Sequence, residues 1–412
     1  MRRRWTTLPR DTRLLLAARA ARSVGQGALI VAFALYLDAL GWSAPAIGAL
    51  FTAGLLIDTA LIVALGPASD RLGRRVFLLA YEAAQAAAAV IALCTAAPAA
   101  LAIAAVVGGF GRGANGSSGP FAPIELSWLS QALPRRERGR VYSLNMAIGF
   151  SGMGIGALLG AGPALLGELL PGALAYRPLF ALVLAGSLVC LVLIALARDA
   201  PAAAPQATTA RPAADAEADR ATRRSENALM RWLFGVNALN GIAIGLVGPL
   251  MTYWFAVRFG RGPADIGPVM ALAYGVTAVS SLFAGRLVDR IGVVRAVVWM
   301  RSLGLAILLV LPLVPSFWMA AALHVVRSAL NRGTAGARQA LTVSLVRPHR
   351  RGAAVSTGSV AIQLPRAIGP LFAGLLFGGG MLAAPFYIAA GFFGAYIYAY
   401  RRVFSAHDPT RR

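Results

Sequence analysis

The chain has 412 residues, of which 58% are hydrophobic and only 13% are charged, and its mean hydropathy is +0.68. Its formal net charge is +23, and all 39 basic residues are arginines. Apolar runs of about 20 residues, the length a helix needs to cross a bilayer core, recur along nearly the whole chain. These features exclude an ordinary soluble protein and predict an all-α integral membrane protein.

Twelve membrane-spanning helices are predicted in chain order. They cover residues 14–38, 46–66, 76–96, 100–131, 141–166, 178–197, 229–257, 264–286, 295–313, 317–342, 353–377 and 383–402. The segment between the sixth and seventh spans is rich in Ala, Pro and charged residues and contains no apolar core. We therefore predict an N-terminal six-helix bundle (1–197), a flexible cytoplasmic linker (198–228) and a C-terminal six-helix bundle (229–412).

Arginines cluster in every second gap between the predicted spans. The clusters include Arg2, Arg3, Arg4, Arg71, Arg74, Arg75, Arg135, Arg136, Arg138, Arg140, Arg220, Arg223, Arg224, Arg286, Arg290, Arg347, Arg350, Arg351, Arg401 and Arg402. Because basic residues near helix ends favour the cytoplasmic side, both termini are predicted to be cytoplasmic, in a bacterial-type inner membrane. This placement accounts for the positive net charge, so nucleic-acid binding is not expected and the lipid bilayer is the expected partner.

The two halves repeat one another. GPASDRLGRR after the second span corresponds to GRLVDRIG after the eighth, so that the pattern G-x-x-x-D-R-x-G occurs twice. Asp70 and Asp289 are 219 residues apart, and Gly156 and Gly369, in the fifth and eleventh spans, are 213 apart. A repeat that keeps this order and spacing predicts two structurally similar bundles.

With this loop motif the chain resembles the major facilitator superfamily of secondary transporters. The resemblance implies two six-helix bundles related by a pseudo-two-fold axis along the membrane normal, with a substrate site between them and alternating access. It also implies that the loop residues form a gating latch on the cytoplasmic side, and Asp70→Asn is expected to lower transport. The predicted gating residues are Gly66, Asp70, Arg71, Gly73, Arg74, Arg75, Gly285, Asp289, Arg290 and Gly292.

Acidic residues inside the predicted spans are candidates for proton coupling. Ionisable groups are costly in hydrocarbon, so they usually face a cavity or an opposite charge. Asp58 lies about 18 Å along an ideal helix from Asp70, which puts it near the middle of the membrane. We predict Asp58, Glu125 and Glu82 as proton-coupling residues, with structural ion pairs to neighbouring arginines as the alternative.

Intramembrane arginines are the candidates for substrate binding. In the tenth span His324, Arg327, Asn331, Thr334 and Arg338 recur every three or four residues and share one helix face, whereas Arg332 is expected to point to another surface. Arg338 is alternatively close enough to the cytoplasm to reach the interface. The predicted substrate-binding residues are Arg112, Arg327, Asn331, Arg338 and Arg366.

Taken together, these features predict a proton-coupled secondary active transporter of a small organic solute that works by efflux. Arg112 opens RGANGSSG, which resembles the arginine-and-glycine motif of drug–proton antiporters, although Gly156–Ala157 departs from their Gly-Pro pair. Uptake or exchange of an organic anion, favoured by the central arginines, and a transporter-like sensor remain the alternatives. We expect a monomer that is not an enzyme and has no cofactor or metal, because no nucleophile–base pair, metal-ligand spacing or phosphate loop is present.

Overall fold

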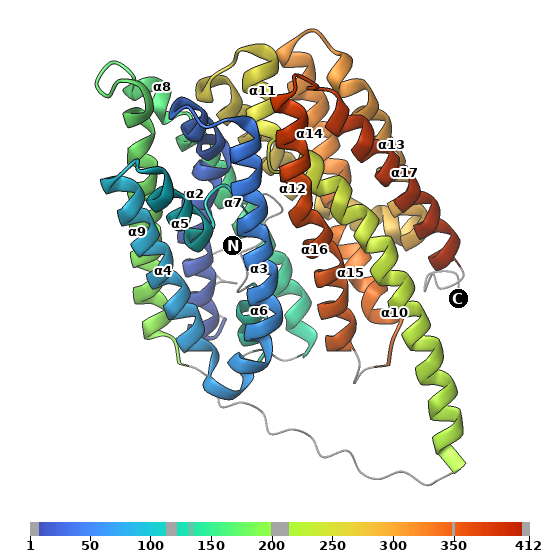
Figure 1. Ribbon diagram of the computed structural model, residues 1–412. Coiled ribbons are helices and arrows are strands. Elements are labelled where there is room, and N and C mark those ends of the chain that lie inside the picture. The colour runs from blue at the N-terminus through green and yellow to red at the C-terminus, as the bar shows by residue number, and fades with distance from the viewer. Residues whose placement is uncertain are drawn as a thin grey trace.

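The computed structural model describes residues 8–112, 122–131, 133, 135–198, 214–347 and 351–405. Within these ranges the secondary structure is helical, without β-strands. Figure 1 shows the first half of the chain, in blue and green, beside the second half, in yellow and red. The predicted all-α class and the arrangement in two helical bundles are confirmed.

The first half crosses the molecule in long helices that alternate in direction. Its elements are α2 (Arg10–Ala39), α3 (Ala44–Leu72), α4 (Arg74–Cys94), α5 (Pro98–Gly108), α6 (Ala122–Gln131), α7 (Arg135–Leu159), α8 (Gly162–Leu166), the 3-10 turn η2 (Gly172–Tyr176) and α9 (Arg177–Leu196).

The second half repeats this path. Its elements are α10 (Ala214–Val247), α11 (Met251–Phe259), α12 (Pro263–Ile291), α13 (Val293–Val310), the 3-10 turn η3 (Leu311–Leu313), α14 (Phe317–Gly333), α15 (Ala335–Ser344), α16 (Arg351–Gly378) and α17 (Ala384–Phe404).

Four predicted spans divide into two α-helices in the described part of the chain, and a fifth ends in a 3-10 turn. Residues 100–131 contain α5 and α6, the fifth span divides into α7 and α8, the seventh into α10 and α11, and the tenth into α14 and α15 at Thr334, while the ninth ends in η3. Eight helical stretches of the described residues are long and apolar enough to cross a membrane. The remaining predicted spans include the divided fourth and tenth, whose separate helices are shorter than a bilayer crossing requires.

Helix α10 begins within the segment predicted as a flexible linker. It starts at Ala214, and the residues from Thr222 to Ser225 are exposed on it. Its first turns are rich in Ala, Glu and Arg, which have high helix propensity, so they form a helix without an apolar core. Residues 214–228 are therefore helical rather than flexible, residues 199–213 lie outside the described ranges, and the bounds of the linker at 198–228 stay a prediction.

The internal repeat has a direct structural counterpart at two glycines. Gly73 joins α3 to α4 with φ +90°, and Gly292 joins α12 to α13 with φ +91°. These backbone conformations are strained for residues with a Cβ atom, which explains why both copies of the loop motif end in glycine.

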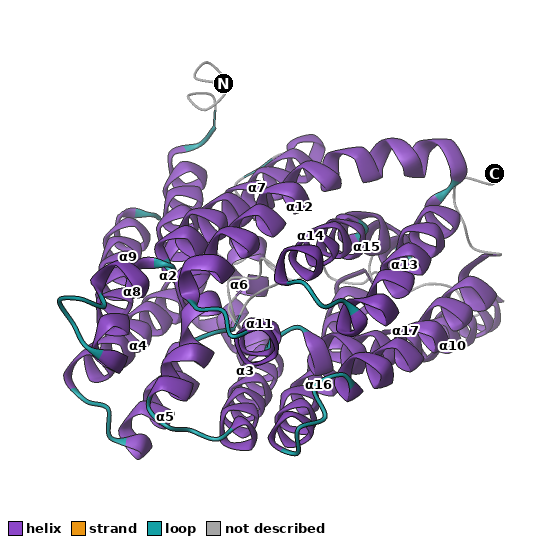
Figure 2. Cartoon of the chain, turned by 90° about the horizontal axis from the view of Figure 1, so that it is seen from above, coloured by secondary structure: helices purple, strands orange, loops and turns teal. Residues whose placement is uncertain are grey.

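The halves pack against each other towards one end of the molecule. We call the end that carries the Gly73 and Gly292 turns the basic end, and the other the closed end. Near the closed end, the amide of Leu371 in α16 donates to Oγ1 of Thr52 in α3 at 3.0 Å, and Gly267 of α12 touches Ala157 of α7. Figure 2 shows α3 beside α16 and α7 beside α12, and these two helix pairs make the main contacts between the halves.

Candidate functional site

A cavity of about 300 Å³ lies mainly within the second half of the chain. Its walls come from helices α10 to α17, and α7 of the first half contributes Met146 and Phe150. It extends from His324 and Met251 to Gln339, an exposed residue on α15 near the basic end. The structure therefore has a cavity directed towards the basic end while the halves are packed together at the closed end.

Five arginines line this cavity, and no Asp or Glu is among its described lining residues. The arginines are Arg301 on α13, Arg327 and Arg332 on α14, Arg338 on α15 and Arg366 on α16. Arg301, Arg327 and Arg366 are 2%, 8% and 3% exposed, so they are withdrawn from bulk water. Within the described chain none of the five forms an ion pair, and the wall is therefore strongly positive.

The protein provides hydrogen-bond acceptors for only some of the N–H groups of these arginines. Arg301 donates to Oδ1 of Asn240 at 3.2 Å, and Arg366 donates to Oε1 of Gln363 at 3.1 Å. Buried N–H groups without a hydrogen-bond partner among the described residues remain at Nε of Arg301, Arg327, Arg338 and Arg366, at Nη1 of Arg332 and at Nδ2 of Asn240. Because unmade hydrogen bonds of buried donors are costly, the cavity is suited to a ligand rich in anionic oxygens.

Aromatic rings position several of these cations. The Phe393 ring of α17 lies 5.7 Å from the guanidinium carbon of Arg301 and 5.9 Å from that of Arg327. The Tyr274 ring of α12 lies 5.1 Å from the guanidinium carbon of Arg332. Aromatic faces attract cations without neutralising them, so the arginines are oriented while their charge remains available.

The structure places four of the predicted substrate-binding residues, Arg327, Asn331, Arg338 and Arg366, on this cavity. The expectation that Arg332 points elsewhere is wrong: it lies in the last turn of α14, and its long side chain reaches the cavity wall beside Tyr274. Arg301 was not predicted at all. The available signal was its position about 12 Å into α13, too deep for an arginine that only marks the interface.

Arg112 is used differently from the other predicted substrate ligands. Its Nη1 is 3.0 Å from a carboxylate oxygen of Asp58 and also donates to the carbonyl of Gly54, and its Nη2 donates to the carbonyl of Val106 at 2.6 Å. It is not among the residues that line the cavity. These contacts hold Arg112 between α3 and the end of α5, so its charge is largely satisfied within the first half.

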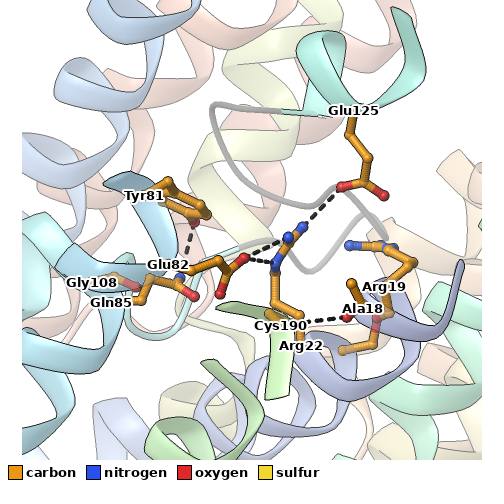
Figure 3. Close-up of polar contacts among 10 residues, drawn as sticks. Ala18, Arg19, Arg22, Tyr81, Glu82, Gln85, Gly108, Glu125 and Cys190 are labelled. Carbon is orange, nitrogen blue, oxygen red and sulfur yellow. Dashed lines mark hydrogen bonds and ion pairs between the residues drawn. The ribbon is translucent and has the colours of Figure 1, made fainter. Parts of the chain in front are cut away.

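Glu82 and Glu125 are both paired with one buried arginine that the sequence analysis did not single out. Nε of Arg22 in α2 donates to Glu82 of α4 at 2.5 Å, and Nη1 donates to Glu125 of α6 at 2.9 Å. Figure 3 shows Arg22 between the two carboxylates, with Arg19 close by. All three members of this triad are buried, so it joins three helices inside the first half.

Part of the predicted gating latch lies outside the described side chains, namely Gly66, Asp70, Arg71, Gly285 and Asp289. Of the others, Arg74 is buried, and Arg75 donates to the carbonyl of Ala195 in α9. The latch therefore stays a prediction, with Gly73 and Gly292 as its two well-defined turns.

Three solved transporters share this fold over almost their full length. The nucleoside transporter NupG aligns with a TM-score of 0.70 at 14% identity, over 96% of this chain and 100% of its own. A bacterial homologue of the human lysosomal transporter Spinster, in an inward-facing and unoccupied conformation, aligns at 0.67 and 15% identity, over 97% and 98%. A D-xylose–proton symporter aligns at 0.66 and 14% identity, over 93% and 96%.

At these identities the solved structures show the fold alone, and no curated protein matches the chain. The sequence model of the Major Facilitator Superfamily, however, matches residues 15–234 and again residues 233–412, which together cover nearly the whole chain. The double match agrees with the internal repeat, and we conclude that the chain belongs to the major facilitator superfamily.

Proposed function

We propose that this protein is a secondary active transporter of a small organic anion, which it binds in the arginine-lined cavity and moves by alternating access. The observation that carries the proposal is the set of five cavity arginines without a carboxylate among the described lining residues. Desolvated cations without partners are unfavourable, and a bound anion removes this cost. Apolar groups such as Phe150 and Met251 in the same wall suit the carbon skeleton of an organic molecule.

We further propose that the basic end faces the cytoplasm of a bacterial-type inner membrane. Arg74, Arg75, Arg290 and Arg295 lie at the ends of helices that meet there, as expected for loops retained on the cytoplasmic side. In this orientation the cavity is directed inwards. Residues 1–197 and 229–412, working as a monomer, would form the two bundles that move relative to each other.

Thermal unfolding of the purified protein tests the anion proposal. Organic anions should raise the midpoint of unfolding more than organic cations at equal ionic strength, because only anions can occupy the guanidinium donors. Arg366→Gln should reduce the anion effect. Arg295→Gln is the matched control, since it removes an exposed arginine from α13 outside the cavity. The proposal would be contradicted if only cations stabilised the protein and if their effect were the same in Arg366→Gln.

Proton coupling is a second proposal, and Asp58 is the acid that supports it best. Asp58 pairs with Arg112 in its own half and also interacts electrostatically with Arg366 of the other half. A change in its protonation would thus alter attraction between the halves as well as within one of them. Glu82 and Glu125 lie instead inside the first half, where the pairing with Arg22 favours a structural role.

Proteoliposomes with an imposed pH gradient test this coupling. Anion uptake by the wild type should follow the gradient, whereas uptake by Asp58→Asn should lose that dependence at equal protein content. A gradient effect that persists unchanged in Asp58→Asn would assign coupling to another group. The expectation of drug efflux rested on Arg112, and because Asp58 and backbone carbonyls engage that residue, anion transport is the better supported function.

A further inference from the structure

Four of the five cavity arginines form two pairs held by different helices, and the fifth, Arg338 on α15, belongs to neither pair. Arg301 and Arg327 lie against the same ring, Phe393, and Asn240 beside them has an unpartnered amide N–H. We call these three polar residues the first anion subsite. Its donors come from α13, α14 and α10.

The second pair is Arg332 and Arg366. Arg332 is held over Tyr274 of α12, and Arg366 is tethered to Gln363 on its own helix, α16. Nη1 of Arg332 and Nε of Arg366 remain without hydrogen-bond partners within the described residues. We call Arg332 and Arg366 the second anion subsite.

The two subsites are separated along α14. Arg327 and Arg332 are five residues apart on this helix, which corresponds to an axial rise of about 7.5 Å. Five residues also turn the helix by about 140°, and the two guanidinium groups lie against rings of different helices, Phe393 of α17 and Tyr274 of α12. One carboxylate is therefore poorly placed to accept hydrogen bonds from both pairs, because charge-assisted N–H···O contacts span only about 2.7–2.9 Å. A monoanion would therefore leave one pair of cavity arginines without an anionic group of the ligand.

From this arrangement we infer that the substrate carries two negatively charged groups at opposite ends of a short carbon skeleton, one for each subsite. The inference rests on the proposed function and narrows it from organic anions to extended dianions. The chemistry fits dicarboxylates and molecules that pair a carboxylate with a phosphate ester. Apolar side chains in the cavity wall, such as Phe150, would contact the skeleton between the charged ends.

A charge series of constant shape tests the inference on the purified full-length protein. Adipate, its monoamide and its diamide have nearly the same size and carry two, one and no negative charges. We expect adipate to stabilise the wild type against thermal unfolding at concentrations at least tenfold below those required for the monoamide, and the diamide to have no effect. Succinate, in which the charged groups are closer together, should be weaker than adipate.

Variants in each subsite provide the second arm. Arg327→Gln and Arg366→Gln should each bring the effect of adipate close to that of the monoamide, because only one charged pair is disrupted in each case. Arg295→Gln should retain the full difference. Each variant removes a positive charge that has no ion-pair partner in the described chain, so it is not expected to unfold the protein. If a variant does unfold, the comparison of adipate with its monoamide on the wild type still tests the two-subsite inference.

The outcomes separate this inference from the proposed function. Equal stabilisation by adipate and its monoamide, or a stronger effect of succinate than of adipate, would overturn the two-subsite inference while organic-anion binding stands. If neither adipate nor the monoamide stabilises the protein and cations do, both proposals fail.

Discussion

The same residue type has opposite consequences in the two halves of this molecule, because its partners differ. Arg22 and Arg112 are buried beside carboxylates in the first half. Arg327 and Arg366 are equally buried but face a cavity wall without acidic residues in the described chain. A paired buried arginine stabilises a particular helix arrangement, whereas an unpaired one at a cavity favours an anionic ligand.

Arg22→Gln is expected to destabilise the protein strongly, since it leaves Glu82 and Glu125 buried without their shared cation. Breaking a buried pair in this way costs about 3–5 kcal/mol. The midpoint of thermal unfolding in detergent measures the effect. The double variant Arg22→Gln and Glu82→Gln should recover much of the loss, because it removes one charge of each sign and leaves Glu125 beside the buried Arg19. A single variant as stable as the wild type would show that the triad makes no net contribution.

At the scale of elements, close packing between helices is repeated in the two halves. A Cβ atom on Gly156 of α7 would lie 1.9 Å from the carbonyl oxygen of Val24 in α2. A Cβ atom on Gly369 of α16 would lie 2.2 Å from the carbonyl carbon of Gly245 in α10. The helix pairs α2–α7 and α10–α16 therefore touch backbone to backbone at equivalent places, as small residues allow in membrane proteins.

Alanine at either glycine is expected to force these helices apart. Gly156→Ala and Gly369→Ala should each destabilise the protein by about 1–3 kcal/mol, the usual cost of overpacking. Gly235→Ala on α10 is the control: its Cβ atom would meet no atom within 4 Å, and alanine has the higher helix propensity. The midpoint of thermal unfolding should therefore fall in Gly156→Ala and Gly369→Ala and should rise or stay unchanged in Gly235→Ala. Equal stability of all three would argue against backbone contact as the reason for the repeated glycines.

At the scale of the whole molecule, the position of the charges constrains the transport cycle. The halves meet near the closed end through α3–α16 and α7–α12, and the arginine-lined cavity is directed to the basic end. Alternating access requires the cavity to pass through a state that is closed at both ends. An empty cavity would then hold five guanidinium groups away from water with only partial compensation, by the interaction of Asp58 with Arg366, and a buried ion without compensation costs several kcal/mol.

Exchange of anions should consequently be faster than net uptake. In proteoliposomes, labelled adipate is expected to enter at least several times faster when the lumen contains unlabelled adipate than when it contains only buffer. The reason is that a bound anion compensates the arginines on the return step. Arg366→Gln should reduce this difference, while Arg295→Gln should preserve it. Equal rates into loaded and empty vesicles would contradict the argument.

Much of the architecture was predictable because the features that place a helix in a bilayer, apolar length and flanking basic residues, are local along the chain. Apolar length defines the spans, and the alternation of arginines orders the helix ends. The motif ending in Gly73 and its copy ending in Gly292 revealed the repeat, since both turns need a positive φ. The breaks within the spans were missed although two of them carry local stop signals, Gly248–Pro249 between α10 and α11 and Gly162–Pro163 at the start of α8, because apolar length was given more weight than glycine and proline.

The candidate site was only partly predictable, since pairing of charges is a property of the fold. The sequence by itself predicted that Arg327, Arg338 and Arg366 lie in apolar spans near one another, but the helix face predicted for Arg327 and Arg338 is interrupted at Thr334, between α14 and α15. Only the tertiary structure decided which charges form ion pairs: Arg22 pairs with Glu82 and Glu125, and Arg112 pairs with Asp58. It also decided that Arg301 and Arg332 line the cavity. The physical reason is that Coulomb attraction and hydrogen bonding act over a few ångströms in space, between helices whose residues are far apart in the chain.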